Sequence, residues 1–170
     1  TERMPGRLVG HVRSAVAVAG ALAELHQIGV FHVDLNPMNI LHRTEAGRPV
    51  VRIVDFESSY ERGRHAKGEF YSPPTTTGYS APEVSDRAPD GRADVFSLGA
   101  VLYTMIAGFS WTWDSDAAAS IESDRDIDPE LARILLAAVD AAPDRRYPSI
   151  EALRADLRAY LEQIWPGRTG

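Results

Sequence analysis

The sequence predicts one mainly α (α+β) domain, in which helices surround a buried central helix and short β-hairpins lie at one edge. The chain of 170 residues is long enough to form one domain with its own core. Residues 94–107 are apolar nearly all round, which is typical of a buried helix. Residues 50–56, VVRIVDF, are rich in β-branched side chains and are the clearest strand.

Local signals set the bounds of the other elements. Pro5 suits a first helical turn, and Gly29 and Gly108 suit the positions just after a helix. Asp128 and Ser149 are capping residues in front of the last two helices. The expected elements, in chain order, are a helix at 5–26, short apolar segments at 30–31 and 40–41, a turn at 45–47, a strand at 50–56, a long polar stretch at 57–89, and helices at 94–107, 129–141 and 150–164.

Composition excludes several classes of protein. The absence of cysteine rules out a disulfide scaffold, thiolate zinc sites and cysteine catalysis, and it fits a cytoplasmic location. With 18 Lys and Arg against 24 Asp and Glu, the net charge of −6 argues against a nucleic-acid partner. Residues 12–23 resemble a signal segment, but their helical spacing favours a buried helix, and we expect no membrane span.

Three segments must be considered together for function. They are HVDLNPMN at residues 32–39, DFE at 55–57, and GYSAPE at 78–83 followed by DVFSLG at 94–99. In these segments the chain resembles a eukaryotic-type serine/threonine protein kinase, specifically its C-terminal lobe, whose patterns are H-R-D-L-x-x-x-N, D-F-G and A-P-E. The resemblance implies that residues 1–170 form an incomplete kinase domain, with the hairpins at the catalytic cleft.

The resemblance implies transfer of the γ-phosphoryl group of ATP to a protein hydroxyl, with Mg²⁺ or Mn²⁺ as the metal. Asp34 corresponds to the base that accepts the hydroxyl proton, a role that typically contributes ~10²–10⁴ in rate. Asn39 and Asp55 correspond to the residues that hold the metal and the nucleotide phosphates, and Leu41 to the residue beneath the adenine. The turn at Gly47 would bring Asn39 and Asp55 together.

Other residues have structural counterparts in the family. Glu83 corresponds to a glutamate that pairs with an arginine before the last helix, for which Arg146 aligns best and Arg145 is the alternative. Asp94 is expected to hold the backbone of the catalytic loop, which is the segment at residues 32–39. Thr76 aligns with the threonine that contacts the catalytic aspartate. The hydroxyls of the activation segment are either phosphorylation sites or ordinary loop residues: Tyr71, Ser72, Thr75 and Thr76.

Three positions depart from the family pattern. Val33 replaces the arginine that pairs with a phosphate on the activation segment, which argues against control by that modification. Asn36 stands at the catalytic position of a lysine that neutralises the transferred phosphate, and it brings no charge. Glu57 replaces the glycine of D-F-G; it resists unusual backbone angles, and it adds a carboxylate that could help hold metal.

No glycine-rich loop or V-A-I-K lysine is found in these residues, and we therefore expect them not to include the N-terminal lobe of a kinase. Leu41 would form the floor beneath the nucleotide. His32 and Phe56 would form the lower half of the family's regulatory stack of side chains, and the residues of its upper half would have to come from elsewhere. We therefore expect the isolated chain to be inactive, and the floor to be covered by an N-lobe in cis or in trans or by self-association. A pseudokinase-like scaffold and a small-molecule phosphotransferase are the alternatives.

Overall fold

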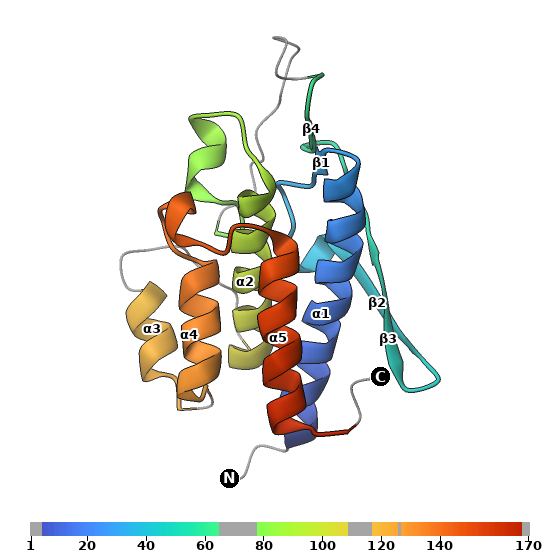
Figure 1. Ribbon diagram of the computed structural model, residues 1–170, viewed down its shortest axis with the longest axis vertical. Helices are drawn as coiled ribbons and strands as arrows, with labels where there is room; N and C mark the ends of the chain where they lie inside the picture. Colours follow the sequence, from blue (N-terminus) through green and yellow to red (C-terminus); the bar gives the residue numbers. More distant parts are fainter. Residues whose placement is uncertain (1–4, 65–77, 109–116, 126, 168–170) are drawn as a thin grey trace.

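The computed structural model describes residues 5–64, 78–108, 117–125 and 127–167, and Figure 1 shows a bundle of upright helices with a long hairpin beside it. The helices are α1 (Pro5–Gln27), α2 (Gly91–Ala107), α3 (Ala117–Ser123), α4 (Pro129–Ala138) and α5 (Ile150–Ile164). The strands are β1 (Val30–Phe31), β2 (Ile40–Glu45), β3 (Arg48–Ile53) and β4 (Tyr60–Glu61), and short 3-10 turns are η1 (Pro37–Asn39), η3 (Pro82–Ser85) and η4 (Pro143–Arg145).

Helix α2 is the buried centre of the bundle, as its apolar sequence predicts. It packs against α1, α4 and α5, and twelve of its residues are buried. The side chain of Asp90 caps its first turn by accepting a hydrogen bond from Arg92 N, and Gly108, with φ 77°, ends it in the left-handed conformation. The helix therefore begins at Gly91, three residues before the predicted start at Asp94.

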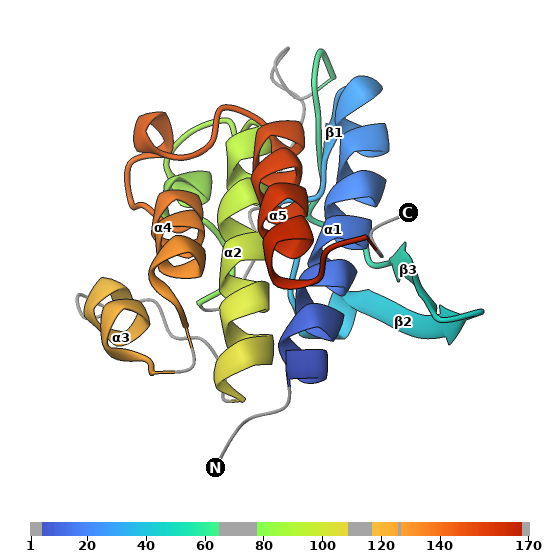
Figure 2. The ribbon, with the colours of Figure 1, turned by 60° about the horizontal axis from the view of Figure 1, so that its bottom comes forward.

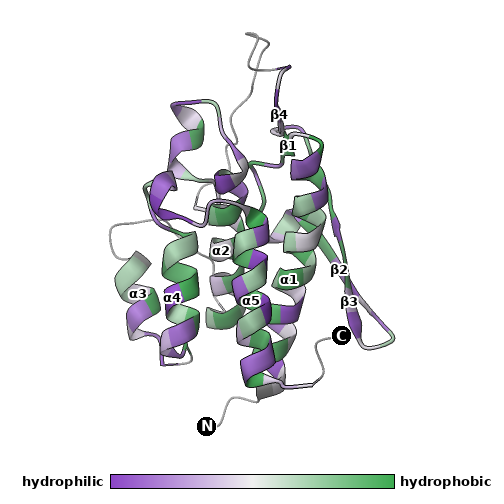
Figure 3. Cartoon of the chain, in the orientation of Figure 1, coloured by the Kyte–Doolittle hydropathy of each residue, from purple (hydrophilic) through white to green (hydrophobic). Residues whose placement is uncertain are grey.

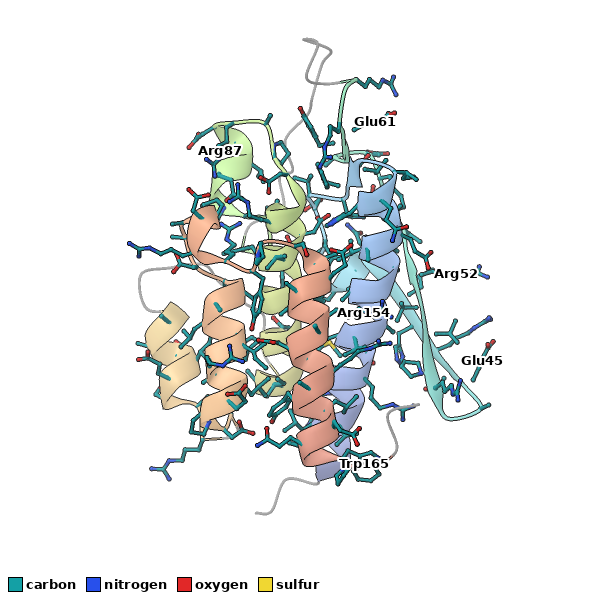
Figure 4. All side chains as sticks on the ribbon, in the orientation of Figure 1. Glu45, Arg52, Glu61, Arg87, Arg154 and Trp165 are labelled. Carbon is teal, nitrogen blue, oxygen red and sulfur yellow. The ribbon has the colours of Figure 1, made fainter. Side chains whose placement is uncertain are left out.

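Helices α1 and α5 lie side by side over much of their length (Figures 1 and 2). Gly20 of α1 allows the close approach, because a Cβ there would lie 3.0 Å from Nη2 of Arg154, which α5 contributes (Figure 4). Gly6–Gln27 is long and apolar enough to cross a membrane by length and composition alone, which leaves the expectation of no membrane span untested. Burial of Val12, Ala19 and Leu22 in the core also accounts for this apolar character.

The long hairpin positions the candidate site. Strands β2 and β3 pair antiparallel from Ile40 opposite Ile53 to Glu45 opposite Arg48. The two-residue turn has φ 47° at Ala46 and φ 74° at Gly47, which matches the twist of a hairpin. Figure 3 shows that apolar residues occur on all five helices as well as on the hairpin.

Several element bounds differ from the sequence predictions. The strand predicted to reach Phe56 ends at Ile53, and the helix predicted to reach Ala141 ends at Ala138. The stretch 57–89 contains β4, which pairs with β1, and the turn η3. Helix α3 also was not predicted. The predicted caps of α4 and α5 are confirmed: Asp128 accepts from two backbone N–H groups, and Ser149 from one.

Candidate active site

Asp94 fixes the start of the catalytic loop from the centre of the bundle. Its side chain is fully buried, and its two carboxylate oxygens accept hydrogen bonds from His32 N at 2.9 Å and Val33 N at 2.7 Å. His26 at the end of α1 lies 2.8 Å from the same carboxylate through Nε2. Because a buried carboxylate needs such partners, the contacts hold the loop and the central helix in one arrangement.

The catalytic loop is closed on itself through the backbone of Asp34. The carbonyl oxygen of Asp34 accepts hydrogen bonds from Asn36 Nδ2 at 3.0 Å and Asn39 Nδ2 at 2.9 Å. Asn36 Oδ1 in turn accepts from Met38 N at 2.9 Å. Asn36 therefore braces the loop, a role that its residue type alone did not predict. Since the amide nitrogen of Asn39 is used by the loop, its Oδ1 is the atom that can approach a metal.

Asp55 reaches this loop through the hairpin. The register of β2 and β3 ends at the pair Ile40 and Ile53, and Val54 N then donates to Asn39 O at 3.0 Å. Asp55 follows Val54 directly, so this backbone hydrogen bond holds the segment of Asp55 beside Asn39. His32 Nε2 lies 3.0 Å from Val54 O, which ties the same segment to the start of the catalytic loop.

The two segments that carry the predicted chemistry have strained backbone. Val33 has φ 68° and Asp55 has φ 66°, both in the left-handed region. This region is tolerated by Asp but is an outlier for a β-branched residue, and strain of this kind costs about 1–3 kcal/mol. The unusual angle therefore falls on Asp55, whereas Glu57 is not among the described residues with positive φ, so the strain expected there is absent.

The cleft side of the site is open to solvent. Leu41 is 54% exposed and Phe56 39% exposed, and the Phe56 ring contacts the buried His32 ring at a centroid distance of 5.0 Å. Asp55 and Glu57 are exposed beside them. Among the described residues no group of three or more His, Asp or Glu side chains is arranged for a metal. An amide oxygen and one or two carboxylates fit Mg²⁺ that is also held by nucleotide phosphates.

Glu83 and Arg146 form the expected ion pair, as a fork of two parallel hydrogen bonds. Glu83 Oε1 and Oε2 each accept a hydrogen bond of 2.8 Å, from Nη1 and Nη2 of Arg146 respectively. The Arg146 side chain is fully buried, and its carbon Cζ lies 4.9 Å from the centroid of the Phe96 ring on α2. Arg145, the alternative partner, is exposed. The fork ties η3 to the turn before α5.

A further contact joins Asp34 to the segment before η3. Ser80 Oγ donates to Asp34 Oδ1 at 3.2 Å. The sequence reasoning did not select Ser80, although it lies inside the GYSAPE motif. The activation-segment residues that it did select, Tyr71, Ser72, Thr75 and Thr76, lie outside the described residues.

The arrangement defines the class of protein. A family model described as "Protein kinase domain" matches residues 11–165, and the chain belongs to this family. The resemblance seen in the sequence is thereby confirmed.

Similar proteins are protein kinases that are longer than this chain. Ribosomal protein S6 kinase alpha-2 of Homo sapiens is 44% identical over 88 residues, which are 51% of this chain and 12% of that protein. Calcium/calmodulin-dependent protein kinase type 1B of Homo sapiens is 29% identical over 167 residues, 91% of this chain and 46% of that protein. The chain thus spans less than half the length of either relative.

Proposed function

We propose that the chain is the catalytic C-terminal lobe of a serine/threonine-type protein kinase, which transfers the γ-phosphoryl group of ATP to a protein hydroxyl. The observation that carries the proposal is the hydrogen bond from Val54 N to Asn39 O, because it joins the segment of Asp55 to the loop of Asp34 and Asn39. A base and two metal-binding groups on separate segments are the parts that phosphoryl transfer needs.

In the proposed reaction Asp34 accepts the proton of the substrate hydroxyl as its oxygen attacks the γ-phosphorus. The bond between the γ-phosphorus and its bridging oxygen breaks, and ADP leaves with that oxygen. Asn39 Oδ1 and the Asp55 carboxylate would hold Mg²⁺, which neutralises phosphate charge when bound. Asn36 supplies no charge to the phosphate; its hydrogen bonds to Asp34 O and Met38 N support a positioning role instead.

The proposed lobe provides only one side of a nucleotide site. Leu41 and Phe56 are apolar and exposed on the cleft side, which supports the view that another surface covers them. An N-terminal lobe, in cis or in trans, would supply the cover and exclude water from the phosphates. Self-association over the same floor is the alternative cover.

The test joins the chain to the glycine-rich N-terminal lobe of a serine/threonine kinase and measures transfer of labelled γ-phosphate to a generic protein and to small hydroxyl acceptors. We expect transfer to the protein, and loss of transfer in Asp55→Asn with partial recovery in Mn²⁺. Transfer to small acceptors alone would favour a small-molecule phosphotransferase. No transfer, with retained binding of the added lobe, would favour a scaffold.

The Glu57→Gly variant distinguishes two roles of Glu57 in the same assay, that of a metal-holding group and that of a suppressor of activity. If its carboxylate helps hold the metal, Glu57→Gly lowers transfer and raises the Mg²⁺ concentration needed for half-maximal rate. This is the expected result, because a carboxylate beside a divalent cation is readily neutralised. A higher rate in Glu57→Gly would instead mean that Glu57 suppresses activity.

A further inference from the structure

Ser80 contacts the side chain of the proposed base from a distant part of the chain. Its Oγ donates a hydrogen bond to Asp34 Oδ1 at 3.2 Å, across 46 residues of sequence. Both residues are half-buried, and Ser80 comes directly before the A-P-E motif. Figure 1 shows its segment, in green, at the end of the bundle opposite the N-terminus. The contact therefore lies far from the first residues of the chain.

The backbone that carries Ser80 is held on both sides. Directly before it, the hydroxyl of the buried Tyr79 lies 3.0 Å from Oγ1 of Thr104 on α2. Three residues after it, Glu83 forms its two hydrogen bonds with Arg146. Because these anchors lie on either side of Ser80, its hydroxyl has a fixed place relative to the central helix and to the turn before α5.

The catalytic loop fixes the main chain of Asp34 rather than its carboxylate. The carbonyl oxygen of Asp34 accepts from Asn36 and Asn39, and Asp34 N donates to His32 O at 2.8 Å. None of these three bonds reaches the carboxylate, and the terminal torsion of an aspartate side chain has only broad preferences. The hydrogen bond from Ser80 acts on the carboxylate itself, so it adds control over the direction in which the oxygens point.

The direction of the carboxylate matters for a base that takes a proton during phosphoryl transfer. The oxygen that accepts the proton must come within about 2.6–3.2 Å of the substrate hydroxyl. A misplacement of ~1 Å can cost roughly 10² in rate. A serine hydroxyl is an uncharged donor, so it can hold an ionised carboxylate in place without neutralising it.

We propose that Ser80 is a positioning residue for the base Asp34. This inference rests on the proposed function, because it assigns Ser80 a role in the same reaction. The Ser80 hydroxyl holds Oδ1 and so turns the carboxylate toward the hydroxyl of the protein substrate, whose proton goes to Asp34. Through Ser80 the base is tied to residues 79–83, and hence to α2 and the turn before α5.

The length of the contact sets the size of the expected effect. Hydrogen bonds between a hydroxyl and an ionised carboxylate are usually about 2.5–2.7 Å long. At 3.2 Å, the Ser80 hydroxyl orients the carboxylate without binding it strongly. Its removal should therefore lower the rate by less than removal of the base itself, which typically contributes ~10²–10⁴.

The test uses the chain joined to the glycine-rich N-terminal lobe and measures kcat and KM for transfer of labelled γ-phosphate to a generic protein. We expect Ser80→Ala to lower kcat about tenfold, while KM for ATP changes by less than about twofold and the thermal midpoint is unchanged. Ser80→Thr keeps a hydroxyl and should restore kcat to within about threefold of the wild type. Ser85→Ala is the matched control, because Ser85 is an exposed serine of the same segment and its loss should leave kcat within about twofold.

Other results would overturn the proposal in distinguishable ways. A wild-type kcat in Ser80→Ala would refute the positioning role and leave the proposed function standing. Equal losses in Ser80→Ala and Ser80→Thr, or a loss that follows a lower thermal midpoint, would show that Ser80 acts through the fold and not through its hydroxyl. Phosphate on Ser80, detected by mass spectrometry of the wild type after incubation with ATP, would make it an acceptor instead of a positioning residue. No transfer by the wild type would refute the proposed function itself, and with it the role of Ser80.

Discussion

The fork between Glu83 and Arg146 gives the sharpest prediction about stability. An arginine side chain has five N–H donors, and all five of Arg146 are engaged. Besides the two bonds to Glu83, Nε donates to Asp140 O at 2.7 Å, Nη1 to Arg92 O at 3.0 Å and Nη2 to Ala141 O at 3.2 Å. The side chains are 0% exposed for Arg146 and 12% for Glu83, so the pair is largely shielded from water.

Removing one partner of a buried ion pair typically costs about 3–5 kcal/mol. We therefore expect Glu83→Gln and Arg146→Met each to lower the free energy of unfolding by about that amount, a large share of the roughly 5–15 kcal/mol of a typical domain. In the double variant no unpaired charge remains, so its loss should be well below the sum of the two single losses. Arg146→Lys should stay destabilised, because lysine cannot form the fork.

The assay is urea unfolding of the chain followed by circular dichroism, with Arg145→Met as the matched control. Arg145 is exposed, and its replacement should change the free energy of unfolding by less than about 0.5 kcal/mol. If Arg145→Met costs as much as Arg146→Met, or if the two losses at the fork simply add, the assignment of a buried, coupled pair is wrong.

Three further predictions concern packing, pH and nucleotide. Gly99→Ala should lower the free energy of unfolding in urea by about 1–3 kcal/mol, because the new Cβ would lie 2.8 Å from Cβ of Ala138. Gly10→Ala should raise the free energy of unfolding by up to about 1 kcal/mol, because the new Cβ meets nothing within 4 Å and alanine favours the helix. The hydrogen bond that Tyr147 donates is the main cause that lowers the pKa of Asp156 in the folded chain. Because this pKa is lower than that of an aspartate in the unfolded chain, about 3.9, the ionised Asp156 stabilises the fold above that pH and the stabilisation is lost as the pH falls below it. The thermal midpoint of wild type should thus fall more steeply than that of Asp156→Asn as pH drops through about 4, and parallel curves would contradict this. Calorimetry should find weak or no binding of ATP·Mg to the chain alone, and micromolar affinity would show that the exposed floor suffices.

The sequence predicted those parts of the fold that depend on local chemistry. Helix α2 was clear because it is apolar all round, and the caps Asp128 and Ser149 act on N–H groups within three residues. Strand β4 was missed because it has two residues and exists only by pairing with β1, about thirty residues earlier in the chain. Helix α3 was missed because it lies within residues 109–128, an acidic stretch with two tryptophans in which no helix was expected.

In the candidate site, too, the local motifs predicted the residues but not the contacts made by distant segments. The order of the motifs was enough to select Asp34, Asn39, Asp55 and Glu83. No pattern in the sequence indicates that Val33 adopts φ 68°, because valine disfavours that region and the buried contacts of the loop enforce it. The contact of Ser80 with Asp34 depends on the path of a distant segment, which no local signal specifies.

The central claim is that Asp34 is the base of a phosphotransfer site, and the rate of the Asp34→Asn variant tests it most directly. The chain joined to a glycine-rich N-terminal lobe is assayed for transfer of labelled γ-phosphate to protein, with the unfolding midpoint measured on the same samples. Asparagine keeps the size of the side chain and the backbone carbonyl that Asn36 and Asn39 bind. We predict a rate at least about 10²-fold lower with an unchanged midpoint. Equal rates in the wild type and Asp34→Asn would contradict the claim.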